Sequence, residues 1–243
     1  MATALVGMGA LGQVGAQPAA SPAFVLKWSA GPFSQDKGNP IAESSPIVAT
    51  LDAAGSAVVV ADRSGYVYAY HLADGSPVTG WPVYDGGAGI DSTPSASTLG
   101  GSNLDSVFVG SGDSQTPAVG AYLAFNPDGQ PLWRTMATNP VGDPRPGYAV
   151  PASLTVGDLQ GSTDVFAGSV GQDALALDAS TGSVLTGWPF FTADSTFSTA
   201  ATADLFGDGQ EELVVGGAST QGLAMGQAYS SGGHVRVIGP DGA

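Results

Sequence analysis

The chain has 243 residues and contains no cysteine, which excludes disulfide staples, thiolate zinc sites and a cysteine nucleophile. It also has only six Lys and Arg against 21 Asp and Glu, a net charge of −15 at pH 7. Binding to nucleic acid or to an anionic membrane surface requires clustered cationic side chains. We therefore expect no nucleic-acid partner, and we attribute most of the acidic surface to solubility.

Long apolar runs and the common catalytic motifs are missing as well. No stretch approaches the roughly 20 apolar residues of a membrane-spanning helix. There is no Gly-x-Ser-x-Gly elbow and no Gly-x-x-x-x-Gly-Lys-Ser/Thr phosphate loop. His71 and His234 are 163 positions apart and have no metal-ligand spacing. The sequence thus predicts no catalytic residue, and we interpret both histidines as structural.

The most abundant residues are small, apolar or turn-forming. Hydrophobic residues make up 43% of the chain, alongside 37 Gly and 17 Pro. A disordered chain would carry fewer apolar residues, and a helical protein would not tolerate so many breakers. Short strands joined by tight turns fit this composition best.

The first 23 residues differ from the rest. Ala2 to Leu11 is mildly apolar, and Val14-Gly15-Ala16 resembles a signal-peptidase site, although no basic n-region precedes it. We interpret residues 1–23 as the end of an export signal or as a flexible leader. The export interpretation predicts a secreted or cell-envelope location.

Four internal repeats organise the remainder. Their openings are spaced by 48, 57 and 49 residues, each before a strand of small residues. The openings are Glu43-Ser44-Ser45-Pro46, Asp91-Ser92-Thr93-Pro94, Tyr148-Ala149-Val150-Pro151 and Phe197-Ser198-Thr199-Ala200. A branched apolar strand, an alternating strand and a hairpin such as Asp74-Gly75 follow, and three repeats then reach a Trp. Units of about 50 residues with four strands are typical of propeller blades.

The fold expected is therefore an all-β propeller of about four blades, each a four-stranded antiparallel sheet. The predicted blades cover residues 43–90, 91–147, 148–196 and 197–243, and residues 24–28 resemble the outer strand that would close the last one. We expect four blades to be the N-terminal part of a larger propeller. An open arc of blades exposes faces and edges, so we also expect a tendency to oligomerise.

Residues 43–243 resemble bacterial propellers of the FG-GAP and VCBS type, which overlap with quinoprotein-like (PQQ-type) propellers. The motif carrying the resemblance is Asp204-Leu205-Phe206-Gly207-Asp208-Gly209-Gln210-Glu211-Glu212-Leu213. Such a loop offers oxygen ligands at the spacing that Ca²⁺ prefers. The predicted ligands are Asp204, Asp208, the Gln210 carbonyl and Glu212. Phe206 stands where the family usually has Asp or Asn, so a Gly-rich turn with solvated acids is the alternative.

Ala176-Leu177-Asp178-Ala179-Ser180-Thr181-Gly182 partly matches the tryptophan-docking repeat of quinoprotein dehydrogenases. In that family the repeat joins blades and binds no cofactor. Those enzymes also place a vicinal cysteine pair over the quinone, which a chain without cysteine cannot do. We therefore expect no PQQ.

One repeat position, immediately before each inner strand, should surround a mouth of the central channel. Its four residues are the predicted ligand-binding set: Glu43, Asp91, Tyr148 and Phe197. A variable loop without a ligand is the alternative. The insertions 113–120 and 218–231 are a second candidate surface.

The sequence favours a secreted, non-catalytic propeller that binds a protein or a glycan. One alternative is part of a propeller enzyme, either a divergent quinoprotein oxidoreductase or a carbohydrate-active enzyme that uses Glu43 and Asp91. Another is a purely structural scaffold module fused to other domains.

Overall fold

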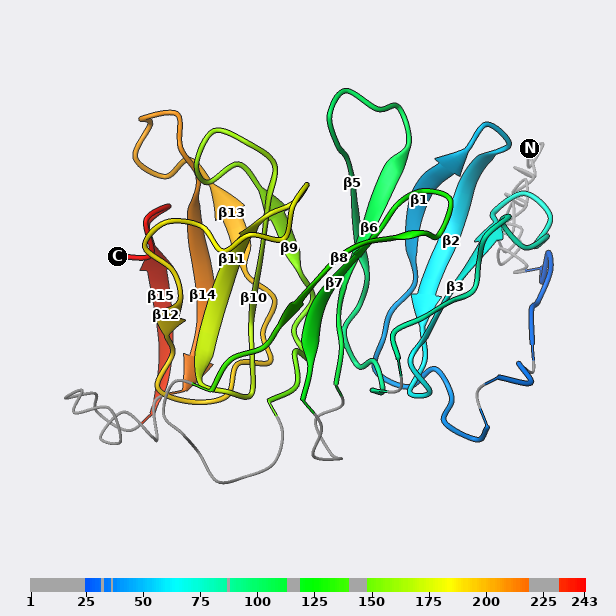
Figure 1. Cartoon of the computed structure of the whole chain (residues 1–243), viewed down its shortest axis with the longest axis horizontal. Coiled ribbons are helices and arrows are strands. Elements are labelled where there is room, and N and C mark those ends of the chain that lie inside the picture. The colour runs from blue at the N-terminus through cyan, green and yellow to red at the C-terminus, as the bar shows by residue number, and fades with distance from the viewer. Residues whose placement is uncertain are drawn as a thin grey trace, which may run out of the picture.

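The computed structural model describes residues 25–31, 33–35, 37–86, 88–112, 119–139, 148–218 and 232–243. These residues form strands β1 to β15 and no helix, in four antiparallel sheets that stand side by side in an arc (Figure 1). The predicted all-β propeller of about four blades is confirmed. The leader 1–23 and the insertion residues 113–118 and 219–231 lie outside the described ranges.

Each sheet is one blade, and its strands follow in chain order from the inside outward. Blade 1 holds β1 (Ile47–Asp52), β2 (Gly55–Ala61), β3 (Tyr66–His71) and β4 (Val83–Tyr84). Blade 2 holds β5 (Ser95–Thr98), β6 (Asp105–Gly110), β7 (Ala121–Phe125) and β8 (Pro131–Met136). Blade 3 holds β9 (Thr155–Gly157), β10 (Asp164–Gly168), β11 (Asp173–Asp178) and β12 (Phe190–Phe191). Blade 4 holds β13 (Ala201–Ala203), β14 (Glu212–Ala218) and β15 (Gly233–Ile238).

The inner strands β1, β5, β9 and β13 are neighbours in that order. Their small side chains, such as Ser95 and Ala96 in β5, let them crowd together near the axis of the arc. The core lies between the blades: Val59 and Val107 belong to one cluster, Tyr122 and Leu175 to the next, and Leu213 to a third. Each blade therefore buries its apolar face against its neighbour, as the repeat pattern predicts.

Tryptophans lock the blades together. Trp81 of blade 1 donates its indole N–H to the Pro127 carbonyl of blade 2 at 3.0 Å. The same bond joins Trp133 to Ala179 in blade 3 at 2.8 Å, and Trp188 to Pro240 in blade 4 at 3.0 Å. Trp28 makes it with the Leu72 carbonyl of blade 1 at 2.9 Å. Three of the four tryptophans therefore join neighbouring blades, and Trp28 attaches residues 25–31 to blade 1.

These locks are of two alternating kinds. The rings of Trp28 and Trp133 lie so close to Gly75 and Gly182 that an added Cβ would be 2.8 and 2.6 Å from a ring carbon. Trp81 and Trp188 instead follow glycines that pack on the backbone of the next hairpin, at Asp128 and Asp241, and both precede a cis proline. Odd-numbered and even-numbered blades thus contact the hairpin of the following blade through surfaces of different shape.

The two ends of the arc differ. The described residues 25–31 form no strand, and Trp28 places them at blade 1, far from β15 (Figure 1). β15 is the last strand of its sheet, and Val235 and Val237 on it are 79% and 51% exposed. Within the described ranges, no helix has the length and apolar character needed to cross a bilayer.

Candidate functional site

In the first two repeats, the serine of the opening has a structural role that the sequence does not reveal. Ser44 Oγ accepts the Ala61 N–H at 3.2 Å, and Ser92 Oγ accepts the Gly110 N–H at 3.1 Å. Both serines are buried and tie the start of an inner strand to the end of the second strand of the same blade. The preceding residues, Glu43 and Asp91, are thereby held at the same rim of the arc.

Arg63, in the turn between β2 and β3, is the charged residue that sequence reasoning missed. Its Nε and Nη2 donate to the two carboxylate oxygens of Asp91 at 2.7 and 2.9 Å, and Nη2 also lies 3.3 Å from Glu43 Oε1. The Asp91 side chain is only 1% exposed, whereas that of Glu43 is 48% exposed. A bidentate pair of this kind fixes both position and orientation. Arg63 therefore joins blade 1 to the start of blade 2.

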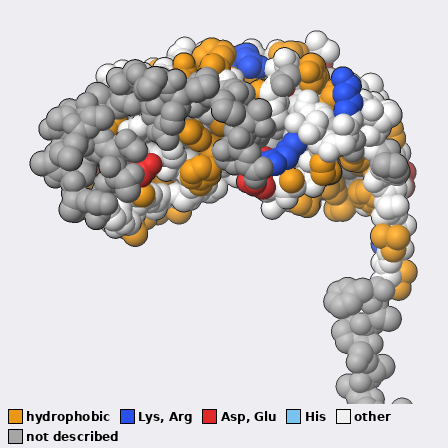
Figure 2. All heavy atoms as spheres, turned by 90° about the horizontal axis from the view of Figure 1, so that it is seen from below, with side chains coloured by type: hydrophobic (Ala, Val, Ile, Leu, Met, Phe, Trp, Pro, Cys, Tyr) orange, Lys and Arg blue, Asp and Glu red, His pale blue; other side chains and the backbone are white. Residues whose placement is uncertain are grey.

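A polar depression of about 220 Å³ lies at this rim. Three of the four predicted mouth residues line it: Glu43, Asp91 and Phe197. Tyr148 is absent from the lining and instead packs against the core between blades 2 and 3. The remaining lining residues are Thr93, Pro151, Ser153 and Thr199. Figure 2 looks at the molecule from below, where the blades form a curved outline with few charged side chains.

The depression offers a ligand one apolar ring surrounded by groups that can form hydrogen bonds. Phe197 is 56% exposed, which is unusual for an aromatic side chain of a folded domain. Thr93, Ser153 and Thr199 supply hydroxyls, and Glu43 supplies a partly solvated carboxylate. An exposed ring beside several short polar groups can accept the apolar face of a ligand and bond to its hydroxyls.

The predicted calcium loop lies at the opposite end of the blades. Asp204 accepts the N–H groups of Gly207 and Asp208 on one oxygen and that of Gly209 on the other, at 2.6 to 3.1 Å. Glu212 is buried and accepts the Leu205 N–H at 2.8 Å. Among the described side chains, no three acidic or histidine groups come together as a metal site.

Blade 3 repeats this arrangement without the motif. Asp164 is buried and accepts the Leu159 and Gln160 N–H groups, both at 3.1 Å. Its burial raises its pKa above the ordinary value, and the same hydrogen bonds oppose that effect. An acid at the first position of the second strand therefore closes the turn before it. Closing the turn is a sufficient role for the buried Glu212 carboxylate. Calcium binding by this loop stays a prediction.

Solved structures of other proteins resemble the chain in fold. No family model and no curated protein matches the sequence. The PilY1 C-terminal domain of Pseudomonas aeruginosa has a TM-score of 0.60 and 14% identity, over 82% of this chain and 51% of that one. Quinohemoprotein alcohol dehydrogenase from Comamonas testosteroni has a TM-score of 0.52 and 17% identity, over 76% of this chain and 32% of that one. Quinohemoprotein alcohol dehydrogenase ADHIIG from Pseudomonas putida HK5 has a TM-score of 0.52 and 16% identity, over 76% of this chain and 32% of that one.

The chain thus spans about a third to a half of the length of the solved structures it resembles. At identities this low, the likeness extends to architecture and not to activity. Taken with the four sheets and their tryptophan contacts, it shows that the chain has a β-propeller fold.

Proposed function

We propose that the chain is an extracytoplasmic, non-catalytic binding module that recognises a glycan at the depression lined by Glu43, Asp91 and Phe197. The observation that carries the proposal is the exposed Phe197 ring among three hydroxyl side chains. Sugar rings have an apolar face and a rim of hydroxyls, so this pairing suits them. The export-like leader supports the location, and the Asp204 to Leu213 motif supports the finer resemblance to FG-GAP and VCBS repeats.

Arg63 favours binding over catalysis at this position. Glycoside cleavage requires one carboxyl group that gives up a proton and a second that acts as base or nucleophile. Both oxygens of Asp91 are engaged by Arg63, so that carboxylate acts as a structural anion. A propeller enzyme remains the alternative function, since two of the similar structures are alcohol dehydrogenases.

A glycan array probed with the 243-residue chain tests the proposal. We expect Phe197→Ala to weaken binding to the selected glycan at least tenfold, about 1.4 kcal/mol. Phe206→Ala is the matched control, because Phe206 is 73% exposed at the other end of β13. Equal binding by both variants would contradict the proposal, and conversion of the bound glycan to product would favour the enzyme.

A further inference from the structure

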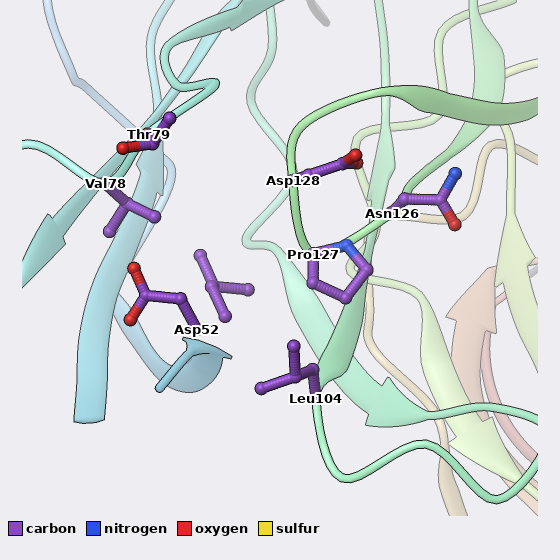
Figure 3. Close-up of a pocket in the computed structure, with 8 residues that line it drawn as sticks. Asp52, Val78, Thr79, Leu104, Asn126, Pro127 and Asp128 are labelled. Carbon is purple, nitrogen blue, oxygen red and sulfur yellow. The ribbon is translucent and has the colours of Figure 1, made fainter. Parts of the chain in front are cut away.

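A second depression lies at the opposite end of β1 from Glu43, between blades 1 and 2. Its volume is about 530 Å³ (Figure 3). It is lined by Leu51, Asp52, Val78, Thr79, Leu104, Asn126, Pro127 and Asp128. Leu104 and Pro127 of blade 2 face Asp52 and Val78 of blade 1 across it (Figure 3).

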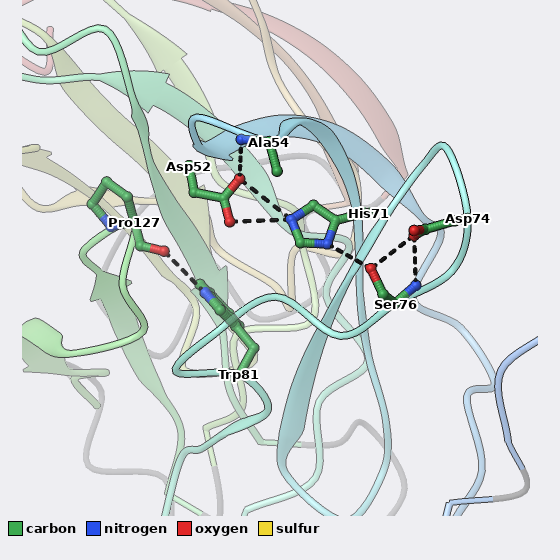
Figure 4. Close-up of polar contacts among 7 residues, drawn as sticks. All are labelled: Asp52, Ala54, His71, Asp74, Ser76, Trp81 and Pro127. Carbon is green, nitrogen blue, oxygen red and sulfur yellow. Dashed lines mark hydrogen bonds and ion pairs between the residues drawn. The ribbon is translucent and has the colours of Figure 1, made fainter.

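This depression has apolar walls on a rigid base. Leu51 and Val78 are each 2% exposed and belong to the core between the two blades. Pro127 is held from below by Trp81, whose indole N–H bonds to its carbonyl (Figure 4). Because the walls are parts of two interlocked blades, the space is preformed, and a ligand pays little to organise it.

The depression continues onto blade 3. A neighbouring depression of about 320 Å³ shares Leu104, Asn126 and Pro127 with the first and reaches Leu132 and Ser180. Ser180 adjoins Ala179, the residue that accepts the Trp133 bond. We call the two depressions together the trough. It crosses three blades, so its length suits an extended chain better than a compact small molecule.

The trough carries negative charge and no positive charge on its lining. Asp52 accepts the Ala54 N–H at 2.8 Å and lies 3.1 Å from His71 Nε2 (Figure 4). Those two contacts lower the pKa of Asp52, so it is ionised at neutral pH. The other side of the His71 ring faces Ser76, which bonds to Asp74. Neither depression has a Lys or Arg among its lining residues.

We propose that the trough binds an extended peptide segment in which apolar side chains adjoin a lysine or arginine. The apolar side chains occupy the space between Leu51 and Leu104 and its continuation beside Leu132. The cationic side chain pairs with Asp52 at the rim. An acidic segment meets Asp52 and Asp128 with no Lys or Arg on the lining to pair with it, so like-charge repulsion selects against it.

A fluorescent library of eight-residue peptides, measured by anisotropy, tests this on the 243-residue chain. We expect the bound peptides to be enriched in Leu or Val next to Lys or Arg. Asp52→Asn should weaken them about tenfold and reduce the salt dependence of binding, because Asn keeps the Ala54 bond but loses the charge. Thr79→Lys, at an exposed lining position, should block binding without disturbing the core.

Asp74→Asn is the matched control, since Asp74 is an exposed turn acid outside the trough. Three results would overturn the proposal: no enrichment of basic peptides, unchanged binding by Asp52→Asn and Thr79→Lys, or binding of hexylamine as tight as that of the best peptide. Peptide binding is independent of the glycan proposal, because Phe197→Ala should leave it unchanged.

Discussion

At the scale of single residues, the most consequential contact joins Arg63 to Asp91. The chain has only six basic side chains, and one of them is bound to a carboxylate that is almost completely buried. Removing one member of a buried ion pair leaves the other charge without compensation, which costs far more than losing an exposed pair.

We therefore expect Arg63→Ala to lower the free energy of unfolding by about 3–5 kcal/mol. Glu43→Gln, which alters the more exposed partner, should cost less than about 1 kcal/mol. Urea denaturation of the three proteins measures both values. Restored stability in the double variant Arg63→Met with Asp91→Leu would support the buried charge as the cause, and a small loss in Arg63→Ala would argue against it.

Arg63 also shows the limit of prediction from sequence. Glu43 and Asp91 could be found because they share a repeat position. Arg63 has no counterpart in the other repeats, and its partner Asp91 lies 28 positions away. Nothing local in the sequence signals such a pair. Tyr148 illustrates the converse, because equivalent sequence positions need not carry equivalent side-chain environments.

At the scale of strands and turns, local signals agreed with one another, so the blades could be predicted. Small residues mark the inner strands, branched residues the second strands and Asp-Gly or Thr-Gly pairs the hairpins. What the turns contribute to blade contacts was not predictable. The hairpin requires a positive φ at Gly182, which is 70°. The missing side chain of Gly182 also leaves room for the Trp133 ring of the preceding blade.

Two alanine substitutions separate these roles. Gly161 has a φ of 86° and open space around it, so Gly161→Ala should cost only the backbone strain, roughly 1–2 kcal/mol. Gly182→Ala adds a clash with Trp133 and should cost about 1–3 kcal/mol more. Thermal unfolding followed by tryptophan fluorescence reports both. Equal losses would mean that the ring contact adds nothing.

The Asp204 to Glu212 loop has a separate test. If it binds Ca²⁺ as its motif predicts, millimolar calcium should raise the melting temperature of the wild-type chain and have no effect on Asp204→Ala. The alternative, in which these acids only close the turn, predicts that Asp204→Ala lowers the melting temperature with or without calcium. An unchanged wild-type melting temperature would therefore end the calcium prediction.

At the scale of the whole molecule, the four blades present unequal ends. Blade 1 carries Phe33, whose ring stacks on Tyr68 at 4.1 Å, together with Trp28. Blade 4 exposes Val235 and Val237 on the last strand of its sheet. Exposed apolar edge strands promote association between chains.

We expect the 243-residue chain to self-associate through β15, with Val235→Lys shifting it toward monomer. Val184→Lys is the control, because Val184 is 45% exposed in a hairpin of blade 3. Sedimentation velocity at several concentrations distinguishes the species. If the Val235→Lys chain still self-associates, the contact between chains does not involve β15. The same holds if Val184→Lys abolishes self-association to the same extent.

The alternation of tryptophan locks constrains how such a chain can be shortened or lengthened. Excising blade 2 alone would bring the Gly80-Trp81 end of blade 1 onto the Gly182 hairpin of blade 3, two shapes that never meet in the native arc. Excising blades 2 and 3 together would instead offer that end to the Asp241 hairpin, whose native partner, Gly187-Trp188, is the same kind of surface. Insertions and deletions in this architecture should therefore be tolerated better as pairs of blades than as single blades.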